Sequence, residues 1–367
     1  MFKRFLAGLL AFALVLLCFG CDRGGKAEKA VFPEGTKAVI FVEDQQYDPE
    51  TYAAAAEFAR IYGENVKVLG IGADYRTNTD IISENAVSAA KDPEVKAMIF
   101  ATGVEGVCRA ARMVREQRED MLIVCCSPRE GNELLSHYAD MTLNVDFAAL
   151  ADSMVQKSKE LGAKSFVFYT TNSMLRYAYI KDLRTAVETA CKQEKLTFKS
   201  ALCVDLSEEG RDSDMANQFI REDLARKEEK FGKETAVFCT DPTVQGVLAQ
   251  EAAARGMAMV STFMPSPLVL ASGLNISLAD HETDSAYAME QLKAAEVQGH
   301  AATWSVSAPI VMLKTAFAYV TSVLADNADT WVEAEDLAAL TADFAGGITF
   351  KGVYDGIFLL QSDLVTL

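Results

Sequence analysis

The sequence has little histidine and none of the spacings that hold a metal ion. Its three histidines, His137, His281 and His300, lie far apart among 367 residues. Neither a CxxC pair nor an HExxH motif occurs. Because zinc sites are built from closely spaced His and Cys ligands, the pattern excludes a histidine-based metal site. We expect no metal and no cofactor.

Motifs of dedicated catalysis are also missing. The sequence contains neither GxSxG nor GxxxxGK[ST], and Gly70-Ile-Gly72 lacks the third glycine of a dinucleotide-binding fingerprint. Glu43 and Asp44 are adjacent carboxylates, but neighbouring side chains of a strand point to opposite faces. With no nucleophile beside a base, the sequence predicts a protein that is not an enzyme.

Clustered positive charge is a third absence. Lys and Arg number 35 against 52 Asp and Glu, which gives a formal net charge of −17. The basic residues are interspersed with acidic ones, as in residues 221–233. An acidic surface repels phosphate backbones, so we expect no nucleic-acid partner.

The N-terminus carries the clearest signal of compartment. Lys3 and Arg4 precede an apolar run over residues 5–19, which is short for a membrane span and typical of a secretion signal. Gly20 and Cys21 follow, and the whole resembles a bacterial lipoprotein signal, with Cys18 where that pattern prefers Leu. The resemblance implies a signal peptide over residues 1–20 and a lipid on Cys21. An uncleaved anchor or an ordinary signal peptide remains the alternative.

Residues 21–35 read as a polar, flexible tether behind this signal. No later segment offers 18 uncharged apolar residues. We therefore expect an extracytoplasmic body, either periplasmic or on the outer face, that is held to the membrane by its lipid. Export permits disulfides, but most of the remaining cysteines lie in apolar strand-like runs that favour buried free thiols. These six are Cys108, Cys125, Cys126, Cys191, Cys203 and Cys239.

Strands and helices alternate along the mature chain in two successive blocks. In the first block we expect strands at 37–43, 66–72, 96–103, 121–127 and 141–146, with helices at 49–62, 78–91, 105–117 and 130–138. In the second block we expect strands at 165–171, 198–205, 235–241 and 257–263, with helices at 147–161, 174–193, 214–230 and 243–255. Near-continuous apolar strands spaced by helices predict α/β lobes with parallel sheets, over 36–146 and 147–265.

The remaining residues, 266–367, form a less regular tail. We expect an extended connection at 265–275, helices at 283–298 and 310–326, an extended segment at 301–309, and strands at 347–352 and 357–363. Such a tail can return to both lobes and complete a hinge between them.

Polar and aromatic residues follow the predicted strands. Parallel sheets bind ligands beyond the carboxyl ends of their strands, so two lobes that face each other along these ends would form a cleft. The candidate ligand-binding residues are Glu43, Asp44, Gln45, Tyr47, Tyr75, Thr102, Gly103 and Ser127 in the first lobe, and Thr170, Thr171, Asn172, Arg176, Asp241 and Phe263 in the second.

Helix capping is the alternative for each of these residues, since Asp, Ser, Thr and Asn also cap the helix that follows a strand. Arg176 stands out because a cation in the first turn of a helix opposes the helix dipole and favours pairing with an anion. Trp304 fits packing near the lobe junction better than a role as a ligand platform.

Taken together, the signal, the tether and the two Rossmann-like blocks resemble the type I periplasmic binding proteins. The segment 238–256 is similar to the second-lobe element of that superfamily, in which a strand-end Asp, here Asp241, begins a ligand loop. More narrowly, the chain resembles an uncharacterised lipoprotein family of that fold, distantly akin to basic-membrane-protein nucleoside receptors. The resemblance covers about residues 35–363 and implies three crossovers, near Asp146, near 265–274, and near 301–309 or Gly346.

The resemblance implies a function as well as a fold. We expect a lipid-anchored receptor that captures a small polar solute, such as a sugar, a nucleoside or a related ring compound. It would deliver that solute to an ABC permease after hinge closure. The alternatives are a sensory receptor for a membrane signalling partner and, third, a surface enzyme or structural lipoprotein.

Overall fold

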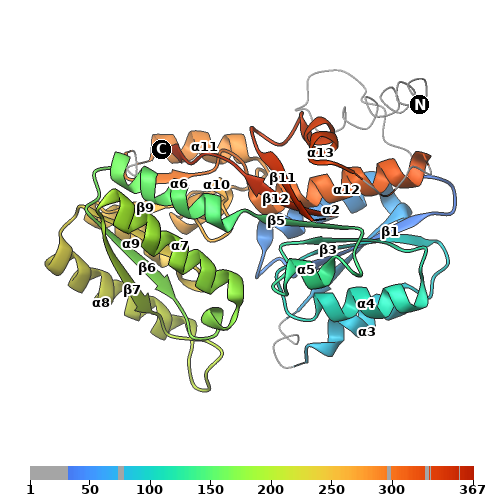
Figure 1. The fold of residues 1–367 in the computed structure, drawn as a ribbon, viewed down its shortest axis with the longest axis horizontal. Coiled ribbons are helices and arrows are strands. Elements are labelled where there is room, and N and C mark those ends of the chain that lie inside the picture. The colour runs from blue at the N-terminus through green and yellow to red at the C-terminus, as the bar shows by residue number, and fades with distance from the viewer. Residues whose placement is uncertain (1–31, 73–77, 296–298, 327–329, 331, 355) are drawn as a thin grey trace. The chain divides into compact units, whose positions relative to one another are not determined.

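The computed structural model describes residues 32–72, 78–295, 299–326, 330, 332–354 and 356–367. Helices and mostly parallel strands alternate along the chain, which confirms the predicted α/β class (Figure 1). The chain divides into two compact units. Unit 1 comprises Met1–Asn144 and Pro309–Leu360, and unit 2 comprises Val145–Ala308 and Gln361–Leu367. The chain therefore passes between the units after residues 144, 308 and 360.

Unit 1 is built on a seven-stranded sheet. Its strands are β1 (Lys37–Glu43), β2 (Val66–Ile71), β3 (Val95–Ala101), β4 (Leu122–Cys126), β5 (Met141–Val145), β11 (Thr349–Tyr354) and β12 (Ile357–Gln361). Their order is β11-β12-β5-β4-β3-β1-β2, and β1 to β5 pair in parallel. The order 2-1-3-4-5 is doubly wound, with its switch point between β1 and β3.

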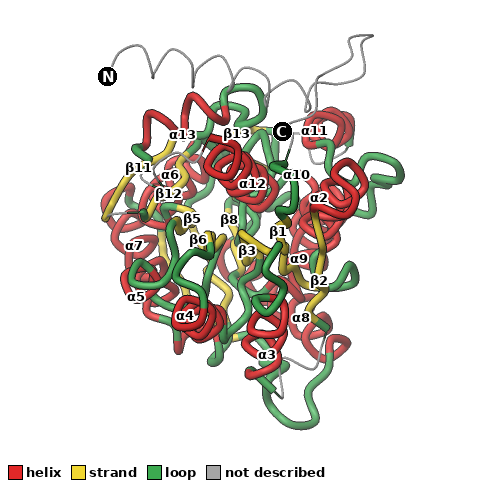
Figure 2. Tube along the Cα trace, turned by 90° about the vertical axis from the view of Figure 1, so that its right-hand side faces the viewer, coloured by secondary structure: helices red, strands yellow, loops and turns green. Residues whose placement is uncertain are grey.

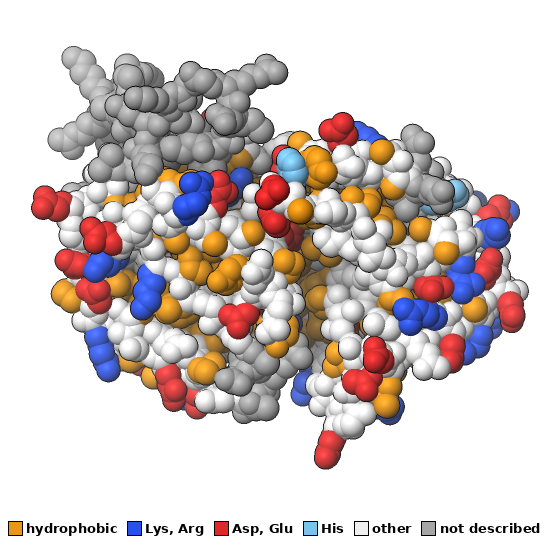
Figure 3. All heavy atoms as spheres, turned by 180° about the vertical axis from the view of Figure 1, so that it is seen from behind, with side chains coloured by type: hydrophobic (Ala, Val, Ile, Leu, Met, Phe, Trp, Pro, Cys, Tyr) orange, Lys and Arg blue, Asp and Glu red, His pale blue; other side chains and the backbone are white. Residues whose placement is uncertain are grey.

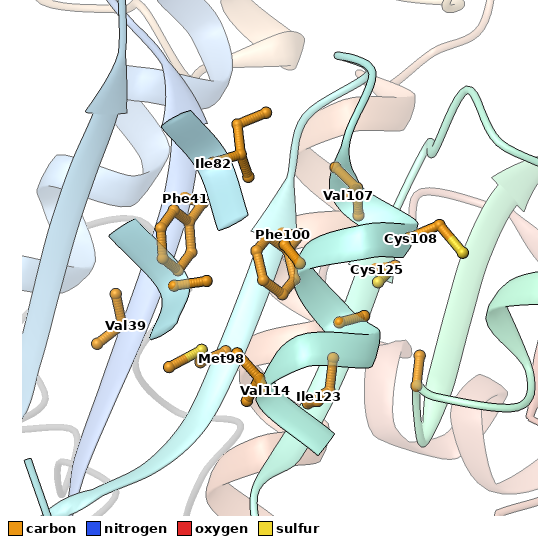
Figure 4. Packing of buried hydrophobic residues seen from close by; sticks show 14 of the residues in the cluster. Val39, Phe41, Ile82, Met98, Phe100, Val107, Cys108, Val114, Ile123 and Cys125 are labelled. Atoms are coloured by element: carbon orange, nitrogen blue, oxygen red, sulfur yellow. The ribbon is translucent and has the colours of Figure 1, made fainter. Parts of the chain in front are cut away.

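Helices cover the central strands of unit 1, and β1, β3, β4 and β5 are buried along most of their length. The helices are α2 (Pro49–Tyr62), α3 (Asp80–Ala89), α4 (Val107–Gln117), α5 (Asn132–Leu135), α12 (Ala308–Asp326) and α13 (Ala334–Thr341). Between the sheet and α3 and α4, Phe41 and Phe100 stack with ring centroids 4.8 Å apart, beside Ile82 and Val107 (Figure 4). Burial of such side chains on both faces of the sheet supplies the core.

Helix α12 is long and apolar enough to cross a membrane, yet 67% of its apolar window is buried within the structure. Its Phe317 stacks on Phe58 of α2 at 4.0 Å and contacts Tyr62 and Phe32. These contacts place α12 beside α2 as a core helix of unit 1 (Figure 1). They also fix Phe32, the first described residue, against the body of that unit.

Unit 2 repeats the plan with six strands. They are β6 (Ser165–Thr170), β7 (Thr197–Leu202), β8 (Thr235–Cys239), β9 (Ala258–Val260), β10 (Ala301–Thr303) and β13 (Val365–Thr366). The order is β13-β10-β9-β8-β6-β7, parallel except for β13 against β10. The order of β6 to β10 matches that of β1 to β5, so the second switch point lies between β6 and β8.

The helices of unit 2 complete the second block. They are α6 (Phe147–Glu160), α7 (Ala178–Glu194), α8 (Ser213–Phe231), α9 (Pro242–Arg255), α10 (Pro267–Gly273) and α11 (Ser285–Ala294). In Figure 2 the strands run between layers of helices, as expected for sheets covered on both faces.

Local predictions fail at three places. Residues 265–275 are not an extended connection, because Ser266 caps α10 by accepting from Val269 N–H at 3.3 Å and Pro267 suits the first helical turn. The helix expected at 174–193 is broken: Met174–Arg176 form a 3-10 turn and α7 begins at Ala178. Helix α13 and strand β13 were not predicted.

Candidate functional site

The edge at the switch point of unit 1 carries four predicted residues. Glu43 ends β1, Thr102 follows β3, and the Thr102 hydroxyl donates to Glu43 Oε1 at 3.3 Å. Gly103 comes next, and a Cβ added there would lie 3.4 Å from the carbonyl oxygen of Ser127. Ser127 follows β4 with φ of 53°, and its hydroxyl lies 3.5 Å from Met312 Sδ. The carboxyl edge of β1, β3 and β4 is therefore polar and close-packed.

A pocket of about 500 Å³ opens at the loop after β1, where the Asp44 side chain lies against Gly70 of β2. Asp44, Gln45, Gln46 and Tyr52 line it. Asp44 is held by its backbone, since its N–H donates to the Ile71 carbonyl at 3.1 Å and its carbonyl accepts from Tyr47 N–H at 2.8 Å. The pocket thus belongs to the loop between β1 and α2, where the sequence predicts Asp44, Gln45 and Tyr47.

The surroundings of this pocket are acidic. Five carboxylates and no basic residue lie between Lys37 and Arg60 in the sequence. Asp48 caps α2 by accepting from Thr51 N–H at 3.2 Å. Burial raises the pKa of the Asp48 carboxyl, against the opposite effect of that hydrogen bond.

The switch point of unit 2 is lined by buried hydroxyls. Thr170 ends β6, and its Oγ1 accepts from the Thr240 hydroxyl at 2.9 Å after β8. Thr171 Oγ1 accepts from Met174 N–H at 3.2 Å, and Asp241 Oδ1 accepts from Thr243 N–H at 2.9 Å. Thr170, Thr171 and Asp241 therefore share one edge, and Asp241 is also the N-cap of α9. Asn172 follows them with an exposed side chain.

Asp205 ties the loop after β6 to the loop after β7. It accepts from the backbone N–H of Ser173 at 2.6 Å and of Ser207 at 3.0 Å, and from both serine hydroxyls. Burial pushes the pKa of Asp205 upward, but the hydrogen bonds from Ser207 and Ser173 outweigh it and lower the pKa. The Asp205 carboxylate therefore holds these two loops in place at the carboxyl edge of the sheet.

Arg176 does not lie where the sequence predicts it. It ends the 3-10 turn, and Tyr177 is extended with φ of −78° and ψ of 133°, so Arg176 precedes α7 instead of occupying its first turn. The dipole argument for an anion partner is therefore wrong. The Arg176 side chain is exposed, and no ion pair involves it among the described residues.

A row of aromatic rings borders the edge of unit 2. Phe263, after β9, stacks on Phe147 at the start of α6 with centroids 5.5 Å apart and 12° between planes. Tyr179 also stacks on Phe147, with centroids 5.5 Å apart, and the Tyr177 ring lies 5.9 Å from that of Tyr179. Phe263 was predicted. The other three rings lie at the starts of α6 and α7. The helices that follow parallel strands start at the carboxyl edge of the sheet. Aromatic residues at predicted helix starts were therefore a signal in the sequence for this row.

Two predicted residues, Tyr75 and Cys21, lie outside the described residues. Trp304 is buried at 1% exposure, consistent with packing, and its Nε1 has no hydrogen-bond partner among the described residues. Thr240, Gln46 and Tyr52 were missed, although Gln46 adjoins predicted Gln45 and Thr240 adjoins predicted Asp241.

The six described cysteines are buried free thiols. Burial raises the pKa values of Cys108, Cys125, Cys126, Cys191 and Cys239, which makes them weak nucleophiles at neutral pH. In the described part of the chain, no group of three His, Cys, Asp or Glu side chains is placed to hold a metal ion.

Known sequences connect the chain to a family without an assigned function. Residues 40–303 match the family described as "Protein of unknown function (DUF3798)". An uncharacterised protein of Treponema pallidum (strain Nichols) is 24% identical over 155 residues, which cover 42% of this chain and 71% of that protein. A second protein of that organism is 24% identical over 127 residues, and the match spans 58% of its length.

Solved structures share the fold. A chain from Clostridium difficile 630, described as a candidate transcriptional regulator, superposes with a TM-score of 0.73 at 20% identity, over 90% of this chain and 99% of that one. A sugar ABC transporter protein from Actinomyces odontolyticus ATCC 17982 gives 0.56 at 12% identity, over 92% and 96%. GanP, a glucose-galactose binding protein from Geobacillus stearothermophilus, gives 0.51 at 14% identity, over 91% and 98%. The architecture is that of the type I periplasmic binding proteins.

Proposed function

We propose that this chain, which belongs to the family described as "Protein of unknown function (DUF3798)" and has the type I periplasmic binding protein fold, is an extracytoplasmic solute receptor. The observation that carries the proposal is the matching pair of switch points. In each unit the two strands that flank the reversal end in hydrogen-bonded polar side chains, Glu43 with Thr102 and Thr170 with Thr240. Ligands of doubly wound sheets bind at such points.

The ligand of the proposal is a small polar compound that contains a ring, and the polar edge of each sheet offers groups that suit it. The hydroxyls and carboxylates at these edges suit the hydroxyl or amide groups of a sugar or nucleoside. The aromatic row of Phe263, Phe147, Tyr179 and Tyr177 supports a ring, because stacked faces favour planar or weakly polar ring surfaces. Asp241 Oδ2 and Asn172 are further candidate contacts.

A lipid on Cys21 would hold this receptor at the membrane, and an ABC permease would receive the solute. Two acyl chains anchor a protein stably, and residues 22–31 would span at most about 35 Å when fully extended. A binding role, not a catalytic one, agrees with thiols whose pKa values burial raises.

Release of a bound compound tests the proposal. The full chain is purified in detergent without denaturation and then unfolded, and the released small molecules are identified by mass spectrometry. A stoichiometric ring compound is expected, because receptors that close on a ligand retain it. If nothing is released and no sugar, nucleoside, amino acid or vitamin raises the melting temperature, the receptor function is wrong.

A matched pair of variants localises that ligand. Phe147→Ala removes the central ring of the aromatic row and should weaken binding about tenfold. Phe231→Ala, at the end of α8, removes a half-buried ring that lies outside the row and should leave affinity unchanged. If the two variants bind the ligand with equal affinity, the aromatic row is not part of the binding site.

The second candidate function is sensing, in which the receptor reports its ligand occupancy to a signalling partner instead of delivering the solute to a permease. The same fold occurs in the chain described as a candidate transcriptional regulator, so ligand occupancy can be read without transport. Uptake of the identified ligand in cells with and without the gene separates the two functions. Loss of uptake supports transport, whereas normal uptake with a lost transcriptional response to the ligand supports sensing.

A further inference from the structure

Asp44 is a half-exposed carboxylate that no Lys or Arg of the described residues pairs with. No hydrogen bond or ion pair of its side chain occurs among the described residues, and its backbone alone is bonded, to Ile71, Tyr47 and Asp48. Elsewhere in unit 1 Asp92, Asp120 and Asp140 all pair with Lys or Arg. A carboxylate at the wall of a pocket, with no side-chain partner in the described part of the chain, is available to a ligand.

Two glycines, one in β2 and one just after it, leave room for the Asp44 carboxylate. A Cβ at Gly70 would collide with Asp44 Oδ1, and a Cβ at Gly72 would lie 3.1 Å from Asp44 Oδ2. The carboxylate therefore lies against bare backbone at Gly70 within β2 and at Gly72 just after that strand. Any side chain at position 70 would displace it, so the two glycines fix where the charge is presented.

The other walls of the pocket suit an organic cation better than a metal ion. The Tyr52 ring lies near Gly70, with its Cε2 4.0 Å from the position of an added Cβ, and aromatic faces attract ammonium groups. Gln45 and Gln46 offer amide oxygens as acceptors. A hard metal ion needs six or more oxygen ligands, and the described residues hold no cluster of three acidic, His or Cys ligands.

We propose that this pocket binds a protonated amine and that the solute of this receptor therefore carries one. The inference rests on the proposed function and narrows its ligand class to ring compounds that bear an amine, such as an amino sugar. The volume of about 500 Å³ admits a group of that size. Asp44 supplies the opposite charge, Tyr52 the aromatic wall, and Gln45 and Gln46 the remaining acceptors.

Matched pairs of probes test the charge. The full chain in detergent is titrated with D-glucosamine against D-glucose, and with putrescine against 1,4-butanediol, by calorimetry and thermal shift. We expect at least one amine to bind about tenfold or more tightly than its neutral counterpart, because a close charge pair is worth that much in a partly screened site. Raised salt should reduce this preference.

Two variants place the effect at Asp44. Asp44→Asn keeps the shape and should abolish the preference for the amine. Gly70→Ala keeps the charge but displaces the carboxylate, and should lower the same preference. Asp343→Asn removes an exposed carboxylate from the same unit and is the matched control, with the preference unchanged.

The outcomes separate this inference from the function on which it rests. Neutral probes that bind as tightly as the amines, or an amine preference that survives Asp44→Asn, overturn the inference and leave the receptor function standing. A compound without an amine, released from the native protein, has the same consequence. Absence of binding by every probe overturns the inference, and absence of any released compound as well overturns both.

Discussion

Single polar residues at the strand ends of this protein serve two purposes. Some of them hold the loops in place, because their side-chain oxygens accept hydrogen bonds from nearby backbone N–H groups. These residues are Asp205, Asp241 and Thr171. Asp44 has no such side-chain partner among the described residues. Residue type could not distinguish these cases in the sequence, since Asp caps helices and binds ligands equally well. The positions of neighbouring backbone N–H groups decide whether such a side chain caps a helix or stays available to a ligand.

Asp205 gives a prediction at this scale. Its lowered pKa means that its hydrogen bonds stabilise the fold fully above the ordinary value of 3.8, and that this stabilisation is lost as pH falls through the folded-state pKa. Asp205→Asn should reduce the unfolding free energy at neutral pH by about 1–3 kcal/mol. The gap to wild type should shrink on acidification below about pH 4.

Urea unfolding over a series of pH values measures this gap. Asp343→Asn, which alters an exposed carboxylate, should track wild type at every pH. A deficit of Asp205→Asn that stays constant down to the acid limit would show that its carboxylate is not held in the charged form.

Elements of secondary structure were predicted well where hydrophobic periodicity is strong and poorly where a cap decides. Strands β1, β3 and β8 follow from their apolar runs, because both faces of a parallel sheet are covered. Helix α10 was missed because its start depends on one hydroxyl, that of Ser266, in a Pro-rich segment. The break before α7 depends on the extended backbone of Tyr177, and hydrophobic periodicity does not predict the conformation of a single residue.

The packing of α9 on α10 gives a prediction at the scale of elements. A Cβ at Gly273 would lie 3.1 Å from Gly246 Cα, so the two helices approach at bare backbone. Gly→Ala in a helix ordinarily stabilises by about 0.5–1 kcal/mol. Gly273→Ala should instead destabilise unit 2 by about 1–3 kcal/mol, because the added methyl overpacks the contact.

The midpoint of denaturant unfolding, followed by circular dichroism, is the measurement. Gly131→Ala is the matched control, since Gly131 has φ of −59° and open space around an added Cβ. Its effect should stay within about 0.5 kcal/mol. A Gly273→Ala variant that is as stable as wild type would mean that α9 and α10 can separate without cost.

Connectivity is the defining feature of the whole molecule. The chain leaves unit 1 through β5 and β12, which are neighbours in one sheet, and the third passage precedes Pro309. Where β5 and β12 end, Gln361 Nε2 donates to Asp146 Oδ2 at 2.8 Å and joins the two segments that leave unit 1. Near Asp146 and within 301–309 the predicted crossovers coincide with these passages, whereas 265–274 is the helix α10 within unit 2.

Net charge gives a prediction for the whole molecule. Lys and Arg side chains are scattered among acidic ones on the face shown in Figure 3, and the formal charge is −17. We expect the protein to pass through a heparin column at low salt and to leave duplex DNA unshifted, because its net negative charge repels polyanions.

A basic protein of similar size, retained by the same column, is the control. Retention of this chain with a steep salt dependence would reveal phosphate contacts and would favour a nucleic-acid role over the proposed receptor.

The sequence by itself determined the α/β class, the two successive blocks and the acidic character, because periodicity and composition are local and additive. It also located most of the polar strand ends, since every parallel strand finishes at the same edge. The tertiary structure alone decided which strands flank the two switch points, which rings stack into a row, and which carboxylate lines a pocket. Those properties depend on contacts between residues far apart in the chain, such as Asp44 against Gly70 and Phe147 against Phe263.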